Sequence, residues 1–182
     1  MNELRESTAL VTGASAGIGE ATARALSAAG ARVLLAARRS ERVEALAAEL
    51  GQNAGGAQAL PFDVRDWPGV AAAVEPHSID IVVANAGLAL GVDPVQDGNP
   101  KDWSVVIDTN VKGVLHTVRA ALPGMIERGR GDVVLLGSVA GRQAYPGGNV
   151  YNASKFAVRG LYEALRLDLK GTGVRVTTVD PG

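Results

Sequence analysis

The fold of this chain is limited above all by six short apolar runs, which alternate with longer amphipathic stretches. The runs predict strands, and they lie at residues 8–12, 32–36, 57–62, 79–84, 132–136 and 174–179. Apolar residues at a helical spacing predict helices, and these lie at residues 17–29, 41–50, 68–74, 102–128 and 150–170. We expect Pro123 to kink or break the fourth of these helices.

Strands that are apolar throughout suit a parallel sheet whose two faces are both covered by helices. The alternation therefore predicts an α/β fold. The expected architecture is a doubly wound Rossmann fold, with a parallel sheet of about six strands in the order 3-2-1-4-5-6. With 182 residues and no visible linker, the chain is expected to be a single domain, residues 1–182. Ligands of such sheets bind at the carboxyl ends of the strands, near the switch point between strands 1 and 4.

The composition argues against several classes of site. The chain has 18 Lys and Arg against 19 Asp and Glu, a net charge of −1, which disfavours a nucleic-acid-binding surface. It has no cysteine, which rules out disulfides, thiolate nucleophiles and Cys-ligated zinc. With only two histidines, His77 and His116, a His-based metal site is not expected. No apolar run is long enough to span a membrane, and residues 1–6 carry no apolar signal-peptide core. We therefore expect a cytoplasmic protein.

A glycine-rich segment, TGASAGIG at residues 12–19, joins the first strand to the first helix. Glycines let the backbone turn tightly and approach a pyrophosphate, and the helix that follows presents free N–H groups and the positive end of its dipole. Such a segment alone can be a simple turn, but its place between a buried strand and a helix predicts a dinucleotide-binding loop. The residues expected to bind the cofactor here are Gly13, Ser15, Gly17, Ile18 and Gly19.

The second strand is followed by two arginines, Arg38 and Arg39, and no carboxylate occurs before Glu41. An acidic residue at this place would bind the ribose 2′-hydroxyl of NAD. Arginine instead suits a 2′-phosphate, because its planar guanidinium makes bidentate, charge-assisted hydrogen bonds. The alternative is a pair of solvated arginines at a helix entry. Together with the glycine loop, the pair predicts NADP(H) as the cofactor.

Two further loops lie at the same edge of the predicted sheet. Asp63 and Val64 follow the third strand, where they either flank the adenine or cap the next helix, and the residues alone do not decide between these. Asn85, Ala86 and Gly87 follow the fourth strand, and their small size would let the cofactor lie close to the backbone, although such a segment is by itself an ordinary turn.

The chemistry is expected at Ser138, Tyr151 and Lys155. Tyr151 and Lys155 are four residues apart, so they share one face of a helix. A tyrosine with its ordinary pKa near 10 is a poor acid or base at neutral pH, but a nearby ammonium lowers that pKa by favouring the phenolate. Ser138 follows the fifth strand, where its hydroxyl would polarise a substrate oxygen. A Tyr–Lys pair at this spacing is usually an ordinary surface pair. Only its position after a cofactor-binding fold favours a catalytic role.

These motifs and their order resemble the short-chain dehydrogenase/reductase family over the entire chain. The resemblance rests on TGASAGIG at 12–19, NAG at 85–87, DTNVKG at 108–113, GSVAG at 137–141, YNASK at 151–155 and the final Pro181-Gly182. The chain departs from the family at Ala84, where members more often have an asparagine, and this matters little for catalysis.

The resemblance implies roles for individual residues. It makes Tyr151 the catalytic acid and base, and Ser138 the residue that hydrogen-bonds the carbonyl. Lys155 would favour the phenolate and hold the nicotinamide ribose. Asn110 would hold a water in a proton relay to Lys155, the alternative being a structural role in a kinked helix. Pro181 and Gly182 join the cofactor-binding residues.

Four segments, at 85–91, 102–113, 121–131 and 145–151, are more specifically similar to the branch of NADP-dependent 3-hydroxy acid and serine dehydrogenases. That branch implies a small 3-hydroxy acid or a related carbonyl as the substrate. The family also implies a homodimer through helices 102–128 and 150–170. Because members continue beyond a residue such as Gly182 with a substrate loop, a helix and a seventh strand, the chain is expected to be truncated and to form a tetramer only when extended.

Three alternative functions compete with this one, and the sequence counts against the second and the third. The first is a catalytically weak or inactive NADP-binding fragment that lacks the substrate lid. The second is an enoyl reductase, which goes with a wider Tyr–Lys spacing in related proteins. The third is a sugar-nucleotide epimerase or dehydratase, whose relatives usually show TGxxGxxG and a larger C-terminal domain.

Overall fold

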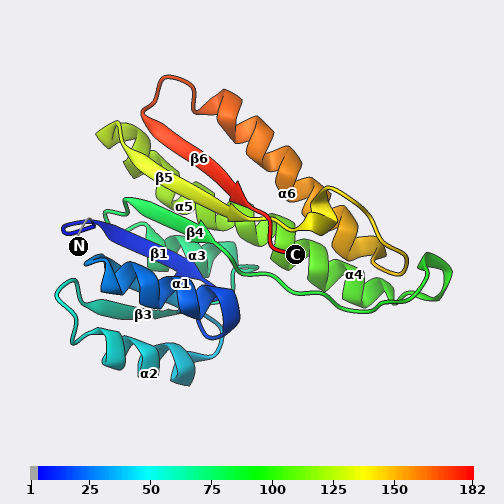
Figure 1. Cartoon of the computed structure of the whole chain (residues 1–182), viewed down its shortest axis with the longest axis horizontal. Helices are drawn as coiled ribbons and strands as arrows, with labels where there is room; N and C mark the ends of the chain where they lie inside the picture. The colour runs from blue at the N-terminus through cyan, green and yellow to red at the C-terminus, as the bar shows by residue number, and fades with distance from the viewer. Residues whose placement is uncertain (1–3) are drawn as a thin grey trace.

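A computed structural model of the chain describes residues 4–182. It contains one six-stranded sheet of parallel strands, hydrogen-bonded in the order β3-β2-β1-β4-β5-β6, which confirms the predicted topology (Figure 1). Residues 1–3 lie outside the described part, and so does half of the segment in which a signal peptide was sought. The strands are β1 (Thr8–Thr12), β2 (Arg32–Ala37), β3 (Ala57–Pro61), β4 (Ile81–Ala84), β5 (Gly131–Leu136) and β6 (Val174–Val179).

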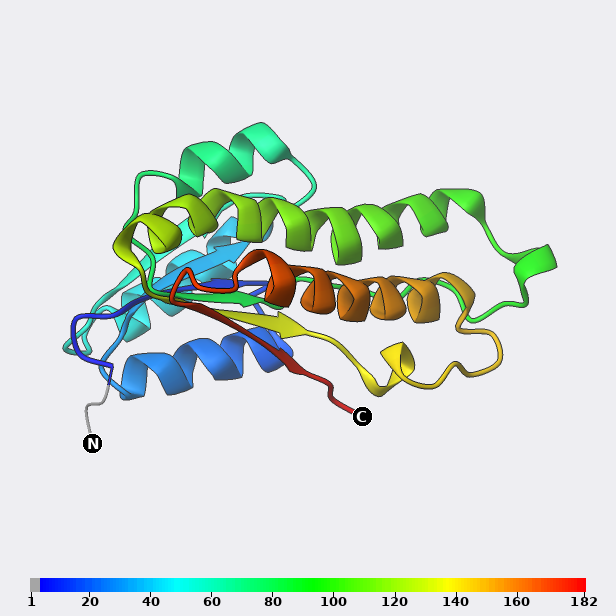
Figure 2. The ribbon, with the colours of Figure 1, turned by 90° about the horizontal axis from the view of Figure 1, so that it is seen from above.

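Helices cover both faces of this sheet. They are α1 (Gly17–Ala28), α2 (Ser40–Leu50), α3 (Trp67–Val74), α4 (Pro100–Ile107), α5 (Gly113–Arg128) and α6 (Asn149–Asp168). Figure 2 shows α3, α5 and α6 on one side of the sheet and α1 on the other. No helix within residues 4–182 is long and apolar enough to cross a membrane.

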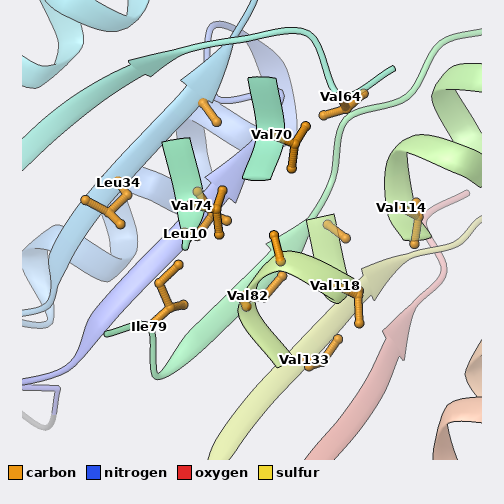
Figure 3. Close-up of a cluster of buried hydrophobic side chains, with 14 of the residues drawn as sticks. Leu10, Leu34, Val64, Val70, Val74, Ile79, Val82, Val114, Val118 and Val133 are labelled. Atoms are coloured by element: carbon orange, nitrogen blue, oxygen red, sulfur yellow. The ribbon is translucent and has the colours of Figure 1, made fainter. Parts of the chain in front are cut away.

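Alternate residues of each strand supply two separate hydrophobic clusters, because successive side chains of a strand point to opposite faces. In β1, Leu10 faces the cluster under α3, α5 and α6, whereas Ala9 and Val11 face the cluster under α1 and α2. Figure 3 shows the first cluster, in which Val82 of β4 and Val118 of α5 also take part. The sheet is thus buried on both faces, as its apolar strands require.

The long helix predicted at 102–128 is two helices joined by a π-helical segment, η2 (Asp108–Lys112). Its start is set by Asn99, whose side chain accepts a hydrogen bond from the Lys101 N–H at 3.1 Å. Pro123 was predicted to kink or break the helix, and it does not break it, since α5 continues to Arg128. Pro123 lies on the exposed side of α5, where water can satisfy the carbonyl that loses its partner.

Two short 3-10 helices were not predicted. The first, η1 (Val95–Asp97), lies in the long segment after β4, and the second, η3 (Val139–Gly141), follows β5. Both are single turns, too short to show a helical period in the sequence. The second matters for the site because it begins directly after Ser138.

Candidate active site

A cleft of about 760 Å³ lies at the carboxyl ends of the strands. Its walls come from the loops after all six strands, from the first turn of α1, from η2 and from one turn of α6, so it occupies the position that a doubly wound sheet offers to ligands. Fifteen of the predicted site residues line it, and they are Gly13, Ser15, Ile18, Arg38, Arg39, Asp63, Val64, Asn85, Ala86, Gly87, Ser138, Tyr151, Lys155, Pro181 and Gly182. Gly17, Gly19 and Asn110 were also predicted but do not line it.

The floor of the cleft is fixed where β1 and β4 end side by side. Thr12 Oγ1 accepts hydrogen bonds from the backbone N–H groups of Asn85 and Ala86, both at 3.1 Å. The Asn85 side chain donates to the Thr12 carbonyl oxygen at 2.8 Å. The Asn85 side chain is therefore committed to holding the two strands together, and the small residues after it form the wall.

The glycines of residues 12–19 each have a distinct structural reason. Gly13 has φ +69°, and a Cβ there would lie 2.7 Å from Asn85 Nδ2. Gly17 has φ +58° and opens helix α1, with no atom close to where its Cβ would be. A Cβ on Gly19 would collide with the Gly13 carbonyl oxygen, so this glycine lets α1 pack against the loop. Because Ala16 caps α1 without a side-chain hydrogen bond, the helix start remains available to an anion.

The two arginines after β2 lie beside this loop. Arg39 donates from Nη2 and Nε to Ser15 Oγ, at 2.8 and 3.2 Å. Arg38 also lines the cleft, and its charge helps to lower the pKa of Asp63. The Arg39 guanidinium thus lies against the glycine loop, and Arg38 lines the same cleft near Asp63.

The loop after β3 supplies Asp63 and Val64 to the cleft. Asp63 forms an ion pair with Arg65 at 2.6 Å, and hydrogen bonds from Arg65 hold the pKa of Asp63 below its usual value. The residue at the N-cap of α3 is Asp66, not Asp63. The cap alternative for Asp63 is therefore wrong, because the side chain pairs within its own loop.

Tyr151 and Lys155 lie one turn apart on α6, as the spacing predicts. Lys155 Nζ donates to the Leu136 carbonyl oxygen at 2.9 Å and lies 5.7 Å from the centroid of the Tyr151 ring. Lys155 is only 8% exposed. Burial lowers the pKa of Lys155 below that of an ordinary lysine, and the negative charge of Asp180 opposes this shift.

Ser138 lies on a loop that is attached to the end of β6. Its Oγ accepts a hydrogen bond from the Ala140 N–H at 3.1 Å, as the N-cap of η3. On either side of it, the Gly137 N–H donates to Val179 O at 2.9 Å and the Val139 N–H donates to Pro181 O at 3.0 Å. These contacts leave the hydroxyl hydrogen of Ser138 free to point into the cleft.

The same loop is held by an ion pair between Arg142 and Asp180, with Nη2 and Oδ2 2.6 Å apart. A Cβ at residue 137 would collide with the Asp180 carboxylate, so only glycine fits there. The ion pair therefore ties the loop that carries Ser138 to the segment that follows β6.

Asn110 is 1% exposed and lies in η2, behind the wall of the cleft. Its amide donates to Leu88 O at 2.8 Å and to Ser154 Oγ at 3.0 Å, and it accepts from the Leu88 N–H at 2.9 Å. The side chain thus ties the loop after β4 to α6. This is a structural role, and the water relay to Lys155 stays a prediction.

Sequence reasoning missed eight residues that line the cleft. Most are small or apolar and carry no chemical signal of their own, and they are Ala16, Ala37, Phe62, Leu88, Ala89, Thr109, Leu136 and Gly137. Only their closeness in sequence to predicted site residues could have indicated them, since each lies within two residues of one. Within residues 4–182 no group of three or more acidic or histidine side chains could hold a metal ion.

Comparison with known proteins identifies the class. The profile of the family described as short chain dehydrogenase matches residues 7–182, and the chain belongs to this family. The NADP-dependent 3-hydroxy acid dehydrogenase YdfG of Salmonella typhi is 47% identical over 178 residues, which cover 95% of this chain and 71% of that protein. The serine 3-dehydrogenase of Agrobacterium fabrum is 45% identical, with 96% and 71% covered.

A solved structure of serine dehydrogenase in a closed form, complexed with NADP+, superimposes with a TM-score of 0.92. It is 44% identical, and the match covers 96% of this chain and 71% of that one. Both the family and its 3-hydroxy acid and serine dehydrogenase branch were predicted from the sequence motifs, and these relatives confirm that resemblance.

Proposed function

We propose that this protein is an NADP(H)-dependent oxidoreductase that interconverts an alcohol and a carbonyl, with a small 3-hydroxy acid or its carbonyl as the substrate. The observation that carries this proposal is a single cleft that joins the glycine loop and two arginines to Ser138, Tyr151 and Lys155. The names of the relatives, NADP-dependent 3-hydroxy acid dehydrogenase and serine 3-dehydrogenase, support the cofactor and the substrate class. The protein would work as a single catalytic domain, and its lack of cysteine fits a cytoplasmic location.

The residues fit NADP(H). The volume of the cleft, about 760 Å³, suits a ligand of that size. The uncapped start of α1 would take the pyrophosphate, with Gly13 and Gly17 letting the backbone approach it. Arg38 and Arg39 would bind the 2′-phosphate, and Ser15 Oγ already holds Arg39 in place.

At the other end of the cleft the chain's own residues donate and accept the proton of the reaction. A bound nicotinamide cofactor would supply the hydride for the carbonyl carbon, or would accept it in the reverse direction. The Tyr151 hydroxyl gives its proton to the carbonyl oxygen, or takes it from the alcohol, while the Ser138 hydroxyl donates a hydrogen bond to the same oxygen. The Lys155 ammonium stabilises the tyrosinate. One of its three N–H groups is used on Leu136, which leaves two for a ribose.

This function is tested with purified protein and a panel of small 3-hydroxy acids and aldehydes, by following NADPH absorbance. Turnover of at least one pair with NADP(H) is expected. If no member of the panel turns over while NADPH binds, the catalytic proposal fails and the alternative, an inactive NADP-binding protein, holds.

The substitution Asp180→Asn is expected to move the alkaline limb of the kcat pH profile to lower pH. Activity needs the Lys155 ammonium. Activity is therefore present below the pKa of Lys155 and is lost as the pH rises through that pKa. The Asp180 charge raises that pKa against the effect of burial. Without this charge the pKa falls further, and the loss comes at a lower pH.

The matched control is Arg142→Gln, which removes the ion pair but keeps the Asp180 carboxylate. Its alkaline limb should not move to lower pH. The measurement is kcat across the pH range at saturating cofactor and substrate. An alkaline limb of Asp180→Asn that coincides with that of the wild type would remove Asp180 from this account.

We also propose that the protein forms a homodimer through the outer faces of α5 and α6. Of the apolar residues on these helices, Val114, Val118 and Val158 are buried inside the chain itself. Phe156 and Leu167 on α6 and Leu115 on α5 stay exposed, and they support a contact between helices.

Light scattering at micromolar concentration should give a mass near twice 18.6 kDa. Phe156→Glu should shift this to a monomer, because a charge would replace an apolar contact. Val92→Glu is the control, since Val92 is an exposed apolar residue that lies on neither helix. A monomeric wild-type protein would refute the proposed interface.

A further inference from the structure

One hydrogen bond connects the wall of the cleft to a residue outside it. His116 Nδ1, on α5, lies 2.8 Å from the carbonyl oxygen of Val64, in the loop after β3. A carbonyl oxygen can only accept, so Nδ1 carries the hydrogen and donates it. Val64 is 7% exposed and lines the cleft, whereas His116 does not.

Helix α5 also packs against this loop on either side of that hydrogen bond. Gly113, one turn before His116, faces Val64 so closely that a Cβ on it would lie 2.6 Å from Val64 Cγ2. The His116 ring is tilted against the Trp67 ring, with the centroids 5.7 Å apart, and the Arg119 guanidinium lies 4.4 Å from the Trp67 ring centroid. The loop is therefore held against α5 at Val64, whereas the contacts of Trp67 hold the first residue of α3.

Apolar packing also holds this loop, since Phe62 and Val64 belong to the hydrophobic cluster under α3, α5 and α6, but packing does not fix the direction of the backbone as a hydrogen bond does. The Asp63 carboxylate is paired with Arg65, two residues along the same loop. That ion pair joins two residues of the same loop, so it does not fix the position of the loop relative to the sheet. Of the hydrogen bonds that the structure shows for Asp63 and Val64, the one from His116 reaches a different element of the fold.

We propose that His116 is a positioning residue for the adenine end of the cofactor cleft. It fixes the backbone at Val64, and thereby sets the place of Asp63 and Val64 against a bound nucleotide. This inference rests on the proposed NADP(H) site. Since His116 touches neither the nicotinamide end nor Tyr151, its effect should fall on cofactor binding and not on the chemical step.

The test compares His116→Phe with His116→Asn. Phenylalanine keeps a ring against Trp67 but cannot donate a hydrogen bond, whereas the asparagine amide nitrogen can take the place of Nδ1. Dissociation constants are measured for NADPH and for two half-molecules, adenosine 2′,5′-bisphosphate and reduced nicotinamide mononucleotide. Thermal unfolding confirms that each variant is folded.

We expect His116→Phe to bind NADPH and adenosine 2′,5′-bisphosphate about three- to tenfold more weakly, the size of one intramolecular hydrogen bond. Affinity for reduced nicotinamide mononucleotide and kcat at saturating cofactor should stay within about twofold of wild type, on the same scale. His116→Asn should recover most of the loss. Hydrogen exchange of residues 62–67 should be faster in His116→Phe than in the wild type, with no nucleotide present.

Arg119→Gln is the matched control, because Arg119 contacts the Trp67 ring and has no hydrogen bond to the loop backbone in residues 4–182. It should leave nucleotide binding unchanged. Unchanged affinity in His116→Phe, or an equal loss for both half-molecules, overturns the inference while the proposed function stands. A wild-type protein that binds neither NADPH nor adenosine 2′,5′-bisphosphate overturns both.

Discussion

Replacing Tyr151 with phenylalanine is expected to lower kcat by about 10²- to 10⁴-fold, the usual contribution of a positioned acid or base. NADPH affinity should stay near that of the wild type. The phenylalanine ring keeps the packing of the tyrosine ring, which lies 5.7 Å from Lys155 Nζ, and only the hydroxyl is lost. The measurement is NADPH absorbance under saturating conditions, together with cofactor titration by fluorescence.

The comparison for this variant is Lys155→Ala, which should weaken both turnover and cofactor binding. Lys155 is buried, holds the end of β5 through Leu136 and lines the cleft beside Tyr151, and under the proposed function it also binds the ribose. Its thermal unfolding is measured in parallel, because the loss of the Leu136 contact also acts on stability. Near-normal turnover in Tyr151→Phe would remove the tyrosine from the mechanism.

The double substitution Arg38→Ala/Arg39→Ala is expected to erase most of the preference for NADPH over NADH. One charge-assisted hydrogen bond contributes about 1.5–3 kcal/mol, so the unmutated protein should prefer NADPH by roughly tenfold or more. Both arginines line the cleft, and Arg39 is hydrogen-bonded to Ser15 of the glycine loop. NADH affinity should change little, because this cofactor carries no 2′-phosphate.

A matched control removes two other arginines of the sheet, as Arg32→Ala/Arg175→Ala. These lie at or near the amino ends of β2 and β6, opposite the cleft, and both are exposed. The control changes the net charge equally and should keep the preference for NADPH. Equal affinity of the unmutated protein for NADPH and NADH would show that the arginines do not select the cofactor.

The fold was predictable because its signals are local. Each strand is an apolar run and each covering helix has an apolar face, and this alternation is typical of a parallel, doubly wound sheet with its usual strand order. The π-helical segment at Asp108–Lys112 was not predictable, since its sequence continues the helical pattern on both sides. Strand β4 begins at Ile81, two residues later than the apolar run. An apolar run marks burial and does not mark the point where ladder pairing starts.

The site was predictable where chemistry lies in short motifs, as for Tyr151 and Lys155. The contacts that hold the site residues in place were not predictable, because they join residues far apart in the chain. Arg39 meets Ser15 across 24 residues, and Lys155 meets the Leu136 carbonyl across 19. His116 showed no chemical motif at all, and only the structure reveals its partner at Val64.

The junction of β1 with β4 has a consequence for how the protein is made. The glycine loop at residues 12–19 is made well before β4, and Thr12 finds its partner Asn85 only 73 residues later in the chain. Until β4 docks beside β1, the anion-binding loop has no wall, and a nascent chain ending before that point has no site for a dinucleotide. Parallel pairings of such separation form slowly. The cofactor can therefore bind only after β4 has paired with β1. Its binding then stabilises a nearly complete fold and does not assist the earlier strand pairings.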